Sequence, residues 1–376
     1  MNWSRIRWLL IVCLLLLNGV LGALLYRQYR AENVVSRAAL ERTAALLAQS
    51  GVTLDVDIVP TAVIKDDVYS ISMTEDDYRA ALSRMVGSAV SGVYLLPSTT
   101  GMSVVFENGD RAEYYHNLYF TYTKSGGNSL GSDWSAMTAA FLSGDTAYVP
   151  AAARDSAATA AGETAAAFLT ALTESDRGGS SVSLRPKTAS VYATPLDTVY
   201  LVVLTEEIAR GSGSRSAAVI HGTELYVLVE GDCVWYLSGT WVPFLPDGIY
   251  ETQTLDQVNI LFSEMRRHRA LKAEASAADT DSADTVPETA DDSGTAVDSG
   301  GAADAVSGYH TGEVCEIVRM ERMHYMLWDN AGNLYLRPAW RFLYRVTEEG
   351  SGETFQRTIL CDGVTGNVVY TEENPS

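Results

Sequence analysis

The stretch WLLIVCLLLLNGVLGALLY, residues 8–26, decides how the rest of the chain is organised. It carries no formal charge and lies between Arg5 and Arg7 on one side and Arg27 and Arg30 on the other. A helix rises 1.5 Å per residue, so this stretch would be roughly 28 Å long, close to the ~30 Å hydrocarbon core of a bilayer. We therefore expect a single N-terminal transmembrane helix over residues 8–26.

A cleaved signal peptide and a buried globular helix are the alternatives for this stretch. The apolar region of a signal peptide is usually about 7–15 residues long, and Gly22-Ala23 is a weak cleavage site. Buried helices rarely run this far without a polar face. Arginines on both flanks leave the positive-inside rule ambiguous. Because residues 1–7 are easier to leave in the cytoplasm than a large domain, we expect a cytoplasmic N-terminus and an extracytoplasmic body.

The composition of the chain argues against several classes of partner. The 376 residues are 47% hydrophobic, which is enough for two modest domains. There are 27 Lys and Arg against 47 Asp and Glu, which gives a net charge of −20. Nucleic acid requires a basic surface, and anionic lipid attracts one. We therefore expect no nucleic-acid partner, and we do not expect the body to lie flat on lipid.

The four cysteines predict no metal site and no cofactor. Cys13 lies in the expected membrane span, which leaves Cys233, Cys315 and Cys361 in the body. None of them stands in a CxxC motif or at a Cys/His spacing typical of zinc. The three can form at most one disulfide, and buried free thiols are an equal alternative.

Periodicity predicts an α+β body of antiparallel sheets with packed helices, because a helix followed by strands recurs three times. The expected helices are 27–49, 75–86, 161–172 and 254–271. The expected strands are 52–58, 101–107, 111–115, 189–192, 198–204, 217–229, 234–237, 313–320, 324–328, 334–344 and 354–360. Asn108-Gly109 predicts a hairpin in which both turn residues have positive φ. Residues 121–133 read as a Gly/Ser-rich loop.

These elements predict a domain organisation in seven parts. They are a cytoplasmic tail 1–7, the span 8–26, a helical stalk 27–50, α+β subdomains 51–160 and 161–272, an acidic insertion 273–306, and C-terminal strands 307–376 that complete the domain. The insertion has nine acidic residues, no basic residue and no aromatic residue. Such a segment buries too little apolar area to offset its ordering entropy, so we expect it to be disordered.

No motif of a known catalytic site occurs, so the sequence does not predict an enzyme. His116 and His324 stand in aromatic strand contexts, where a place in the core is the expected one. The adjacent carboxylates Asp66-Asp67 and Glu206-Glu207 would face opposite ways on a strand, and we expect solvated positions for them. Aromatic residues near the C-terminus predict core packing, with a carbohydrate or peptide groove as the alternative; they are Trp328, Tyr335, Trp340 and Tyr344.

Both ends of the chain resemble one family. The opening MNWSR at residues 1–5, followed by a leucine-rich span that holds Leu17-Asn18, resembles the start of YycI-type proteins. RPAWRF at residues 337–342 and TGNV at residues 365–368 resemble the closing strand and final turn of that family, although Asn367 stands where Glu is usual. The matching segments are the first ~30 and last ~60 residues, and the middle of the chain diverges.

The resemblance implies an accessory regulator and not an enzyme. Proteins of this family are single-pass regulators of the YycG–YycF (Wal) cell-wall two-component system of Gram-positive bacteria, and with the related YycH they tune the sensor kinase. The expected partners are therefore a YycG/WalK-like sensor histidine kinase, a YycH-like protein and the lipid bilayer. A wall- or membrane-anchored carbohydrate-binding module or enzyme is the alternative.

The expected contact face with the kinase lies on the membrane helix. Three small residues, one amide and one tyrosine fall within an arc of about 140° at 100° per residue; they are Gly19, Gly22, Ala23, Asn18 and Tyr26. Small residues let helix backbones approach in lipid, and a partner helix can satisfy the Asn18 amide. The sequence therefore predicts that this face binds the membrane helices of the kinase.

Overall fold

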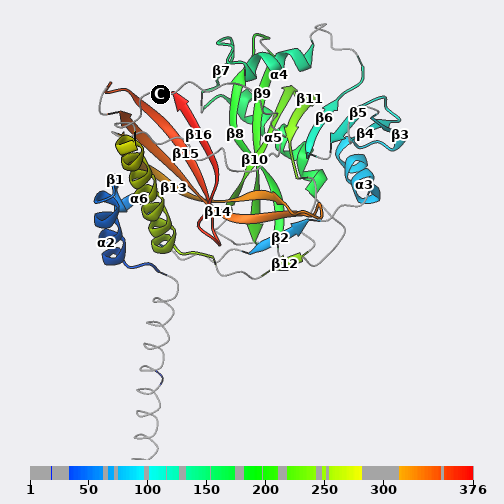
Figure 1. Cartoon of the computed structure of the whole chain (residues 1–376). Helices are drawn as coiled ribbons and strands as arrows, with labels where there is room; N and C mark the ends of the chain where they lie inside the picture. Colours follow the sequence, from blue (N-terminus) through cyan, green and yellow to red (C-terminus); the bar gives the residue numbers. More distant parts are fainter. Residues whose placement is uncertain are drawn as a thin grey trace, which may run out of the picture. The chain divides into compact units, whose positions relative to one another are not determined.

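The structure is a computed structural model (Figure 1). It describes residue 18 and residues 34–61, 67–71, 75–96, 101–115, 117–126, 133–152, 154–173, 182–196, 198–210, 218–242, 248–250, 254–281, 313–348 and 351–375. The chain forms two compact units, each built from separate segments. Unit 1 comprises residues 1–66, 252–322 and 338–376, and unit 2 comprises residues 67–251 and 323–337.

The expected fold class, α+β with a single transmembrane helix, is wrong. The structure is mainly β, with 49% of the described residues in strands and 28% in helices. Sheet prevails because strands predicted as short pieces are long and continuous, as where residues 313–320 and 324–328 form one strand. No helix among the described residues is long and apolar enough to cross a membrane. Apart from residue 18, the stretch 8–26 lies outside the described residues.

Unit 1 is a sheet with two helices packed on it. Its helices are α2 (Arg37–Ala48) and α6 (Gln257–Asp281), with a short 3₁₀ helix η1 (Val56–Ile58). Its strands are β1 (Val52–Leu54), β13 (Glu313–Trp328), β14 (Leu334–Glu348), β15 (Thr354–Asp362) and β16 (Val368–Pro375). The end of β13 and the start of β14, within residues 323–337, belong to unit 2. β1 is parallel to β13, whereas β14, β15 and β16 pair antiparallel in that order.

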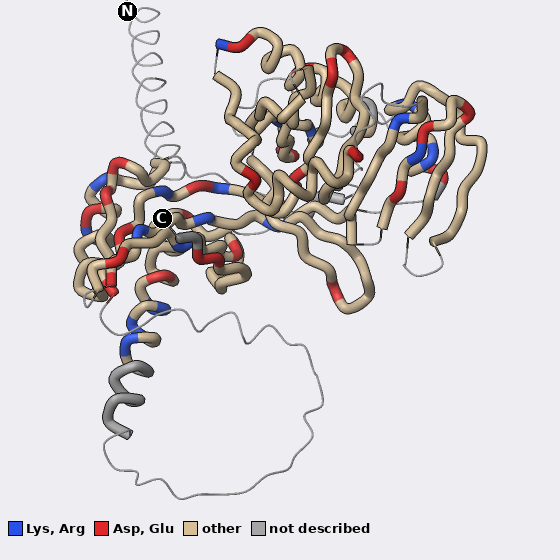
Figure 2. Tube along the Cα trace, turned by 90° about the horizontal axis from the view of Figure 1, so that it is seen from above, with Lys and Arg blue, Asp and Glu red and all other residues tan. Residues whose placement is uncertain are grey.

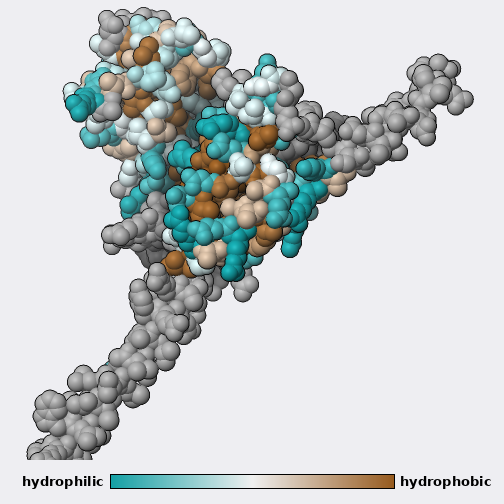
Figure 3. Space-filling view, turned by 90° about the vertical axis from the view of Figure 1, so that its left-hand side faces the viewer, coloured by the Kyte–Doolittle hydropathy of each residue, from teal (hydrophilic) through white to brown (hydrophobic). Residues whose placement is uncertain are grey.

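The core of unit 1 lies between its helices and one face of its sheet. Leu40 and Leu47 of α2 and Leu261 of α6 are fully buried, and they cluster with Phe342 and Ile359 of the sheet. Alternation along β14 and β15 places these apolar residues on the helix side. On the face of the molecule that Figure 3 shows, apolar side chains lie among hydrophilic ones.

Unit 2 is a long, mainly antiparallel sheet with helices on both faces. Its strand order is β7-β8-β9-β10-β11-β6-β5-β4-β3, and every neighbouring pair is antiparallel. The strands are β3 (Val90–Leu95), β4 (Gly101–Phe106), β5 (Arg111–Tyr115), β6 (Tyr119–Thr123), β7 (Val149–Pro150), β8 (Val182–Ala193), β9 (Val199–Arg210), β10 (Ala218–Glu230) and β11 (Cys233–Thr240). β2 (Val68–Ile71), β12 (Gly248–Tyr250) and residues 323–337 of β13 and β14 complete the unit.

Helices cover the two faces of this sheet unequally. α3 (Glu75–Val86) and α5 (Ser156–Thr173) pack on one face, over Val202, Leu204 and Val227. α4 (Trp134–Leu142) packs on the other face, over Leu201 and Leu228. Neighbouring residues of a strand point to opposite faces, which is why the two clusters separate so cleanly. α4 lies over β9, β10 and β11, and no helix of the described residues covers the same face over β5 and β6.

Several predicted elements are confirmed. α3 has the expected bounds, and α5 includes the expected 161–172 but begins earlier, where Asp155 accepts from the backbone N–H groups of Ala157 and Ala158. The hairpin at Asn108-Gly109 joins β4 and β5 as expected. Its turn differs from the prediction, since only Gly109 has positive φ and the loop closes between Phe106 and Asp110.

Other predictions fail for identifiable local reasons. The expected strand 52–58 ends at Leu54, because the Asp55 carboxylate accepts from the Asp57 N–H and starts the turn of η1. The helix predicted for 254–271 begins after Asp256, whose carboxylate accepts from the Asn259 N–H and so caps the helix, and it extends to Asp281. It thus enters the segment 273–306, the rest of which lies outside the described residues, as do residues 27–33 of the expected stalk.

A buried arginine joins three strands of unit 1. Arg357 on β15 is buried, and its guanidinium bonds both carboxylate oxygens of Glu313 on β13 at 3.0 and 3.3 Å. Its Nε donates to Glu373 on β16 at 2.7 Å. Glu313 is as buried as the arginine, so its charge depends on the guanidinium for compensation.

We predict that Arg357→Met destabilises the protein by about 3–5 kcal/mol, because it leaves the buried Glu313 carboxylate without its counter-charge. Arg345→Met is the control, since its ion pair with Glu316 is about half exposed and should contribute no more than about 1 kcal/mol. Urea unfolding monitored by circular dichroism measures both. Equal losses of unfolding free energy in the two variants would show that the buried ion pair contributes no more to stability than the exposed one.

Candidate functional site

The structure places only one of the residues predicted to contact the kinase. Asn18 is helical and exposed, whereas Gly19, Gly22, Ala23 and Tyr26 lie outside the described residues. The predicted contact face therefore stays a prediction. In the described part of the chain no three His, Cys, Asp or Glu side chains are placed to hold a metal ion. There too, Cys233, Cys315 and Cys361 are free thiols.

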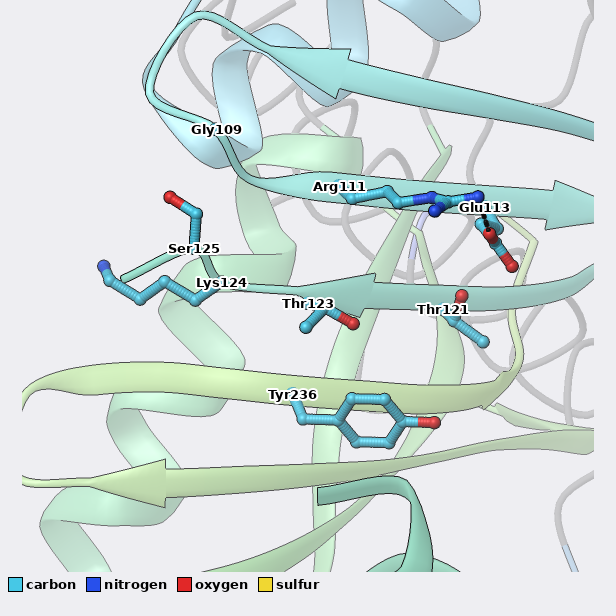
Figure 4. Close-up of a pocket in the computed structure, with 8 residues that line it drawn as sticks. All are labelled: Gly109, Arg111, Glu113, Thr121, Thr123, Lys124, Ser125 and Tyr236. Atoms are coloured by element: carbon cyan, nitrogen blue, oxygen red, sulfur yellow. Dashed lines mark ion pairs between the residues drawn. The ribbon is translucent and has the colours of Figure 1, made fainter. Parts of the chain in front are cut away.

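The strongest candidate site is a groove on the open face of unit 2 (Figure 4). It has a volume of about 420 Å³ and lies across β5, β6 and β11. Strand register produces it: Arg111, Thr123 and Tyr236 stand opposite one another on these three strands. One pleat further on, Glu113 and Thr121 are likewise opposite. The intervening residues point to the other face and fill the core.

An ion pair forms the fixed part of the groove. The Nη2 of Arg111 is 2.7 Å from Oε1 of Glu113, and its Nε donates to the Ser103 hydroxyl at 2.9 Å. The Tyr115 hydroxyl donates to the other oxygen of Glu113 at 2.9 Å. These contacts hold both charged groups in place without using all of their hydrogen-bonding capacity.

Several donors of the groove remain free to bind a ligand. Two of the roughly five N–H groups of the Arg111 guanidinium are used, and no other described residue takes the rest. Among the described residues, the hydroxyls of Thr121 and Thr123 likewise have no partner. Burial raises the pKa of Tyr236, an effect that its hydrogen bond with Ser238 partly offsets. Its phenol is therefore neutral at physiological pH.

Figure 4 shows how these side chains are arranged. The Tyr236 ring lies flat along β11 with its face toward the open side of the sheet. The Arg111 guanidinium, Glu113 and Thr121 gather near the hydroxyl end of that ring, whereas Lys124 points to the opposite end of the groove. The groove therefore offers one flat aromatic surface beside one mixed polar cluster, and its two cations do not converge.

Strand β3, at the edge of the same sheet, is a second candidate surface. Among the described strands it pairs only with β4. Its sequence VSGVYL carries no charge, and the strand at the right-hand end of the sheet is uncharged throughout in Figure 2. Tyr94 and Leu95 are 61% and 82% exposed, the highest values for large apolar side chains in the described part of the chain.

The opposite edge of the sheet is protected. β8 carries Arg185, Pro186 and Lys187, a register shift follows at Thr188, and the short β7 covers its end. Charges, proline, bulges and short covering strands are the devices that prevent edge-to-edge pairing. β3 has only a bulge at Ser91, whose hydroxyl donates to the Val105 carbonyl at 3.0 Å. Within the part of the chain that the structure describes, no strand pairs with the outer side of residues 92–95, which form a regular, unprotected edge.

Two buried carboxyls have opposite electrostatics. In unit 1, burial by itself would raise the pKa of Glu264, but Arg267 at 2.5 Å, with hydrogen bonds from Cys361 and Tyr344, holds that pKa below its usual range. The neighbouring His268 has its pKa lowered to about 4 by burial and by Arg267. The Glu264 carboxylate therefore has its counter-charge and its hydrogen-bond donors within unit 1.

In unit 2, Glu206 is fully buried, which contradicts the expected solvated position. Its Oε2 accepts from the Val242 N–H at 3.1 Å, while no described residue bonds Oε1. Burial raises the pKa of Glu206 well above its ordinary value. The neighbouring Glu207 lies near Lys187 at 3.5 Å, so the two adjacent carboxylates do face opposite ways.

The remaining predicted residues are distributed over both units. His324 is buried beside Tyr69 in unit 2, with ring centroids 5.7 Å apart, which confirms its expected place in the core. Trp340 and Tyr344 are buried in unit 1, whereas Trp328 and Tyr335 belong to unit 2, where Trp328 is exposed. His116 lies outside the described residues.

The groove was not predicted from the sequence, because residues 121–133 were expected to form a loop. Residues 119–123 form β6, which supplies Thr121 and Thr123. The alternation Tyr119-Phe120-Thr121-Tyr122-Thr123, rich in aromatic and β-branched residues, is the signal that could have found the strand.

Comparison with known proteins gives distant structural likeness only. No family model matches the chain, and no curated protein matches its sequence. An uncharacterized protein from Eubacterium rectale, solved at 1.45 Å, covers 85% of this chain and 90% of its own, with 12% identity and a TM-score of 0.36. The match to the YpeB C-terminal domain of Bacillus megaterium covers 92% of this chain and 100% of that domain, with 10% identity and a TM-score of 0.22. That domain is a weak structural neighbour.

We predict that Glu206→Gln is more stable than wild type at the same pH, and that this difference grows as the pH rises above about 4–5, the ordinary pKa of a glutamate. The folded protein keeps the Glu206 proton in a range where the unfolded chain has already released it. The contribution of Glu206 to the free energy of unfolding of wild type is therefore greatest below the pKa of this group in the unfolded chain. It falls between that pKa and the higher pKa in the folded protein, by up to about 1.4 kcal/mol per pH unit.

Urea midpoints of wild type and Glu206→Gln at pH 5 and pH 8 measure this difference. The gap between the two proteins should be small at pH 5 and larger at pH 8. A gap of the same size at both pH values would mean that Glu206 is ionised in the folded protein.

Proposed function

We propose that this protein is an accessory regulator of the YycI type, which binds a sensor histidine kinase of a cell-wall two-component system and carries out no catalysis. We further propose that it acts at the cell membrane, with its body outside the cytoplasm. The observation that carries the proposal is the unprotected edge of β3, because an open strand edge recognises an extended segment of another polypeptide.

The geometry of β3 favours strand addition. The Leu96 N–H donates to the Gly101 carbonyl at 3.0 Å, so Leu96 directs its backbone groups toward β4. In an antiparallel pair every second residue directs its backbone N–H and C=O groups away from the partner strand. Val93 and Leu95 therefore direct N–H and C=O groups outward, where an added strand would pair with them. Tyr94 and Leu95 would supply side-chain contacts on the two faces of that strand.

The partner fits a different protein better than a second copy of this chain. Each copy carries a net charge of −20, which opposes association between copies at low salt. The edge strand itself is uncharged, so it imposes no such penalty on a neutral or basic segment. We therefore propose an extended segment of the extracytoplasmic part of the kinase, with a YycH-like protein as a further partner.

The C-terminal motifs that carry the family resemblance both lie in unit 1 apart from Arg337, which supports the proposal. The Gly363 N–H donates to the Pro338 carbonyl at 2.8 Å, and a Cβ at Gly363 would come within 2.9 Å of that oxygen. Gly366, with φ of +76°, lies in the turn between β15 and β16. Pro338 of the first motif thus contacts Gly363, which lies two residues before the second motif.

We predict that the double variant Tyr94→Lys with Leu95→Lys lowers capture of the kinase at least about tenfold, since charges on an edge strand block strand addition. The full-length chain and the kinase are produced together in membranes, and the amount of kinase that co-purifies is measured. Leu142→Lys on α4 is the matched control, because Leu142 is also an exposed apolar residue, at 59%.

Failure of the wild type to capture the kinase would contradict the proposed partner. Equal capture by the double variant would move the contact away from β3. If the chain instead forms dimers that the double variant abolishes, the edge of β3 is an interface between copies and the proposal for this surface is wrong.

A further inference from the structure

We propose that the groove formed by β5, β6 and β11 binds a saccharide, with Tyr236 as the stacking surface and the Arg111–Glu113 pair as the clamp for sugar hydroxyls. This inference concerns the face of the sheet and not its edge, so it does not depend on partner binding at β3. It goes beyond regulation by assigning a small-molecule ligand to the extracytoplasmic body.

The hydrogen-bonding groups of the groove match a polyhydroxylated ligand. The backbone groups of β5, β6 and β11 are paired within the sheet, so a ligand on this face meets side chains only. Arg111 offers donors, Glu113 offers acceptors, and the Thr121 hydroxyl offers both. A sugar hydroxyl donates one hydrogen bond and accepts others at once. It is therefore the ligand group that uses this mixed cluster completely.

The Tyr236 ring supplies the apolar part of the site. Its face is turned to the open side of the sheet, next to the cluster that holds the Arg111 guanidinium (Figure 4). One face of a pyranose carries mainly C–H groups, which pack against an aromatic ring, while the hydroxyls at the ring's edge reach neighbouring polar groups. Tyr115 and Tyr119, with centroids 5.9 Å apart, extend the aromatic surface beyond Glu113.

The charges of the groove do not suit an anion. Glu113 is 2.7 Å from the Arg111 guanidinium and already neutralises it. Lys124 points to the other end of the groove, so the two cations do not converge on one ligand atom. The chain as a whole carries a net charge of −20, which repels anions at long range. A neutral saccharide meets none of these penalties.

The test is calorimetric titration of the purified full-length chain with maltotetraose, cellotetraose and the N-acetylglucosamine tetramer. At least one of these should bind saturably, with a Kd below about 10 mM. Arg111→Gln and Thr121→Val should each weaken that binding, the first by at least about tenfold. Tyr236→Leu should abolish it, whereas Tyr236→Phe, which keeps the ring, should stay within about threefold of wild type.

Arg345→Gln is the matched control for Arg111→Gln. Arg345 is 56% exposed and pairs with a glutamate at 2.8 Å, whereas Arg111 is 55% exposed and pairs at 2.7 Å. Binding by Arg345→Gln should equal that of wild type. Circular dichroism shows whether each variant is folded, and Thr121→Val tests the site with the smallest change in shape.

Three results would overturn the proposal. The first is that none of the three tetrasaccharides binds. The second is that Arg111→Gln and Thr121→Val both bind as tightly as wild type, which would place the saccharide elsewhere. The third is that inorganic phosphate binds the groove and displaces the sugar, which would make it an anion site. None of these results alters kinase capture by β3, so failure here and failure of the proposed regulator remain distinguishable.

Discussion

The alternation of side chains along the strands of unit 2 is the constraint on which both of its candidate surfaces depend. Ala112, Tyr122 and Leu237 point to one face and are buried under the helices. Arg111, Thr123 and Tyr236, which precede or follow them by one position, must then point to the other face. A shift of register by one residue would exchange the two sets and bury the groove's ion pair.

A single glycine fixes this register where β11 meets β10. Gly239 has a φ of +145°, and a Cβ there would lie 2.0 Å from the Glu224 carbonyl oxygen. The two backbones approach so closely that no other residue fits. This contact sets the position of β11, and with it the position of Tyr236 beside Thr123 on β6.

How much could be predicted from the sequence follows from how local each feature is. α3 was predicted with its correct bounds because its periodicity lies within twelve residues. The Glu264 cluster could not be predicted, because its members Tyr344 and Cys361 are distant in sequence and meet only when strands pack on α6. Glu206 was misjudged for the same reason: strand alternation shows that it faces away from Glu207, but not which face is buried.

The groove and the edge of β3 lie on one continuous sheet, which has a consequence for regulation. β3, β4, β5, β6 and β11 are joined by successive antiparallel pairs, so the position of each strand depends on its neighbours. The saccharide that we propose would bridge β5, β6 and β11, so it would restrict the motion of these strands and, through β4, of the edge. If that ligand changes the affinity of β3 for its partner, the partner must change the affinity for the ligand by the same factor. A regulator built in this way would report saccharide binding on the face of the sheet as a change in protein binding at its edge.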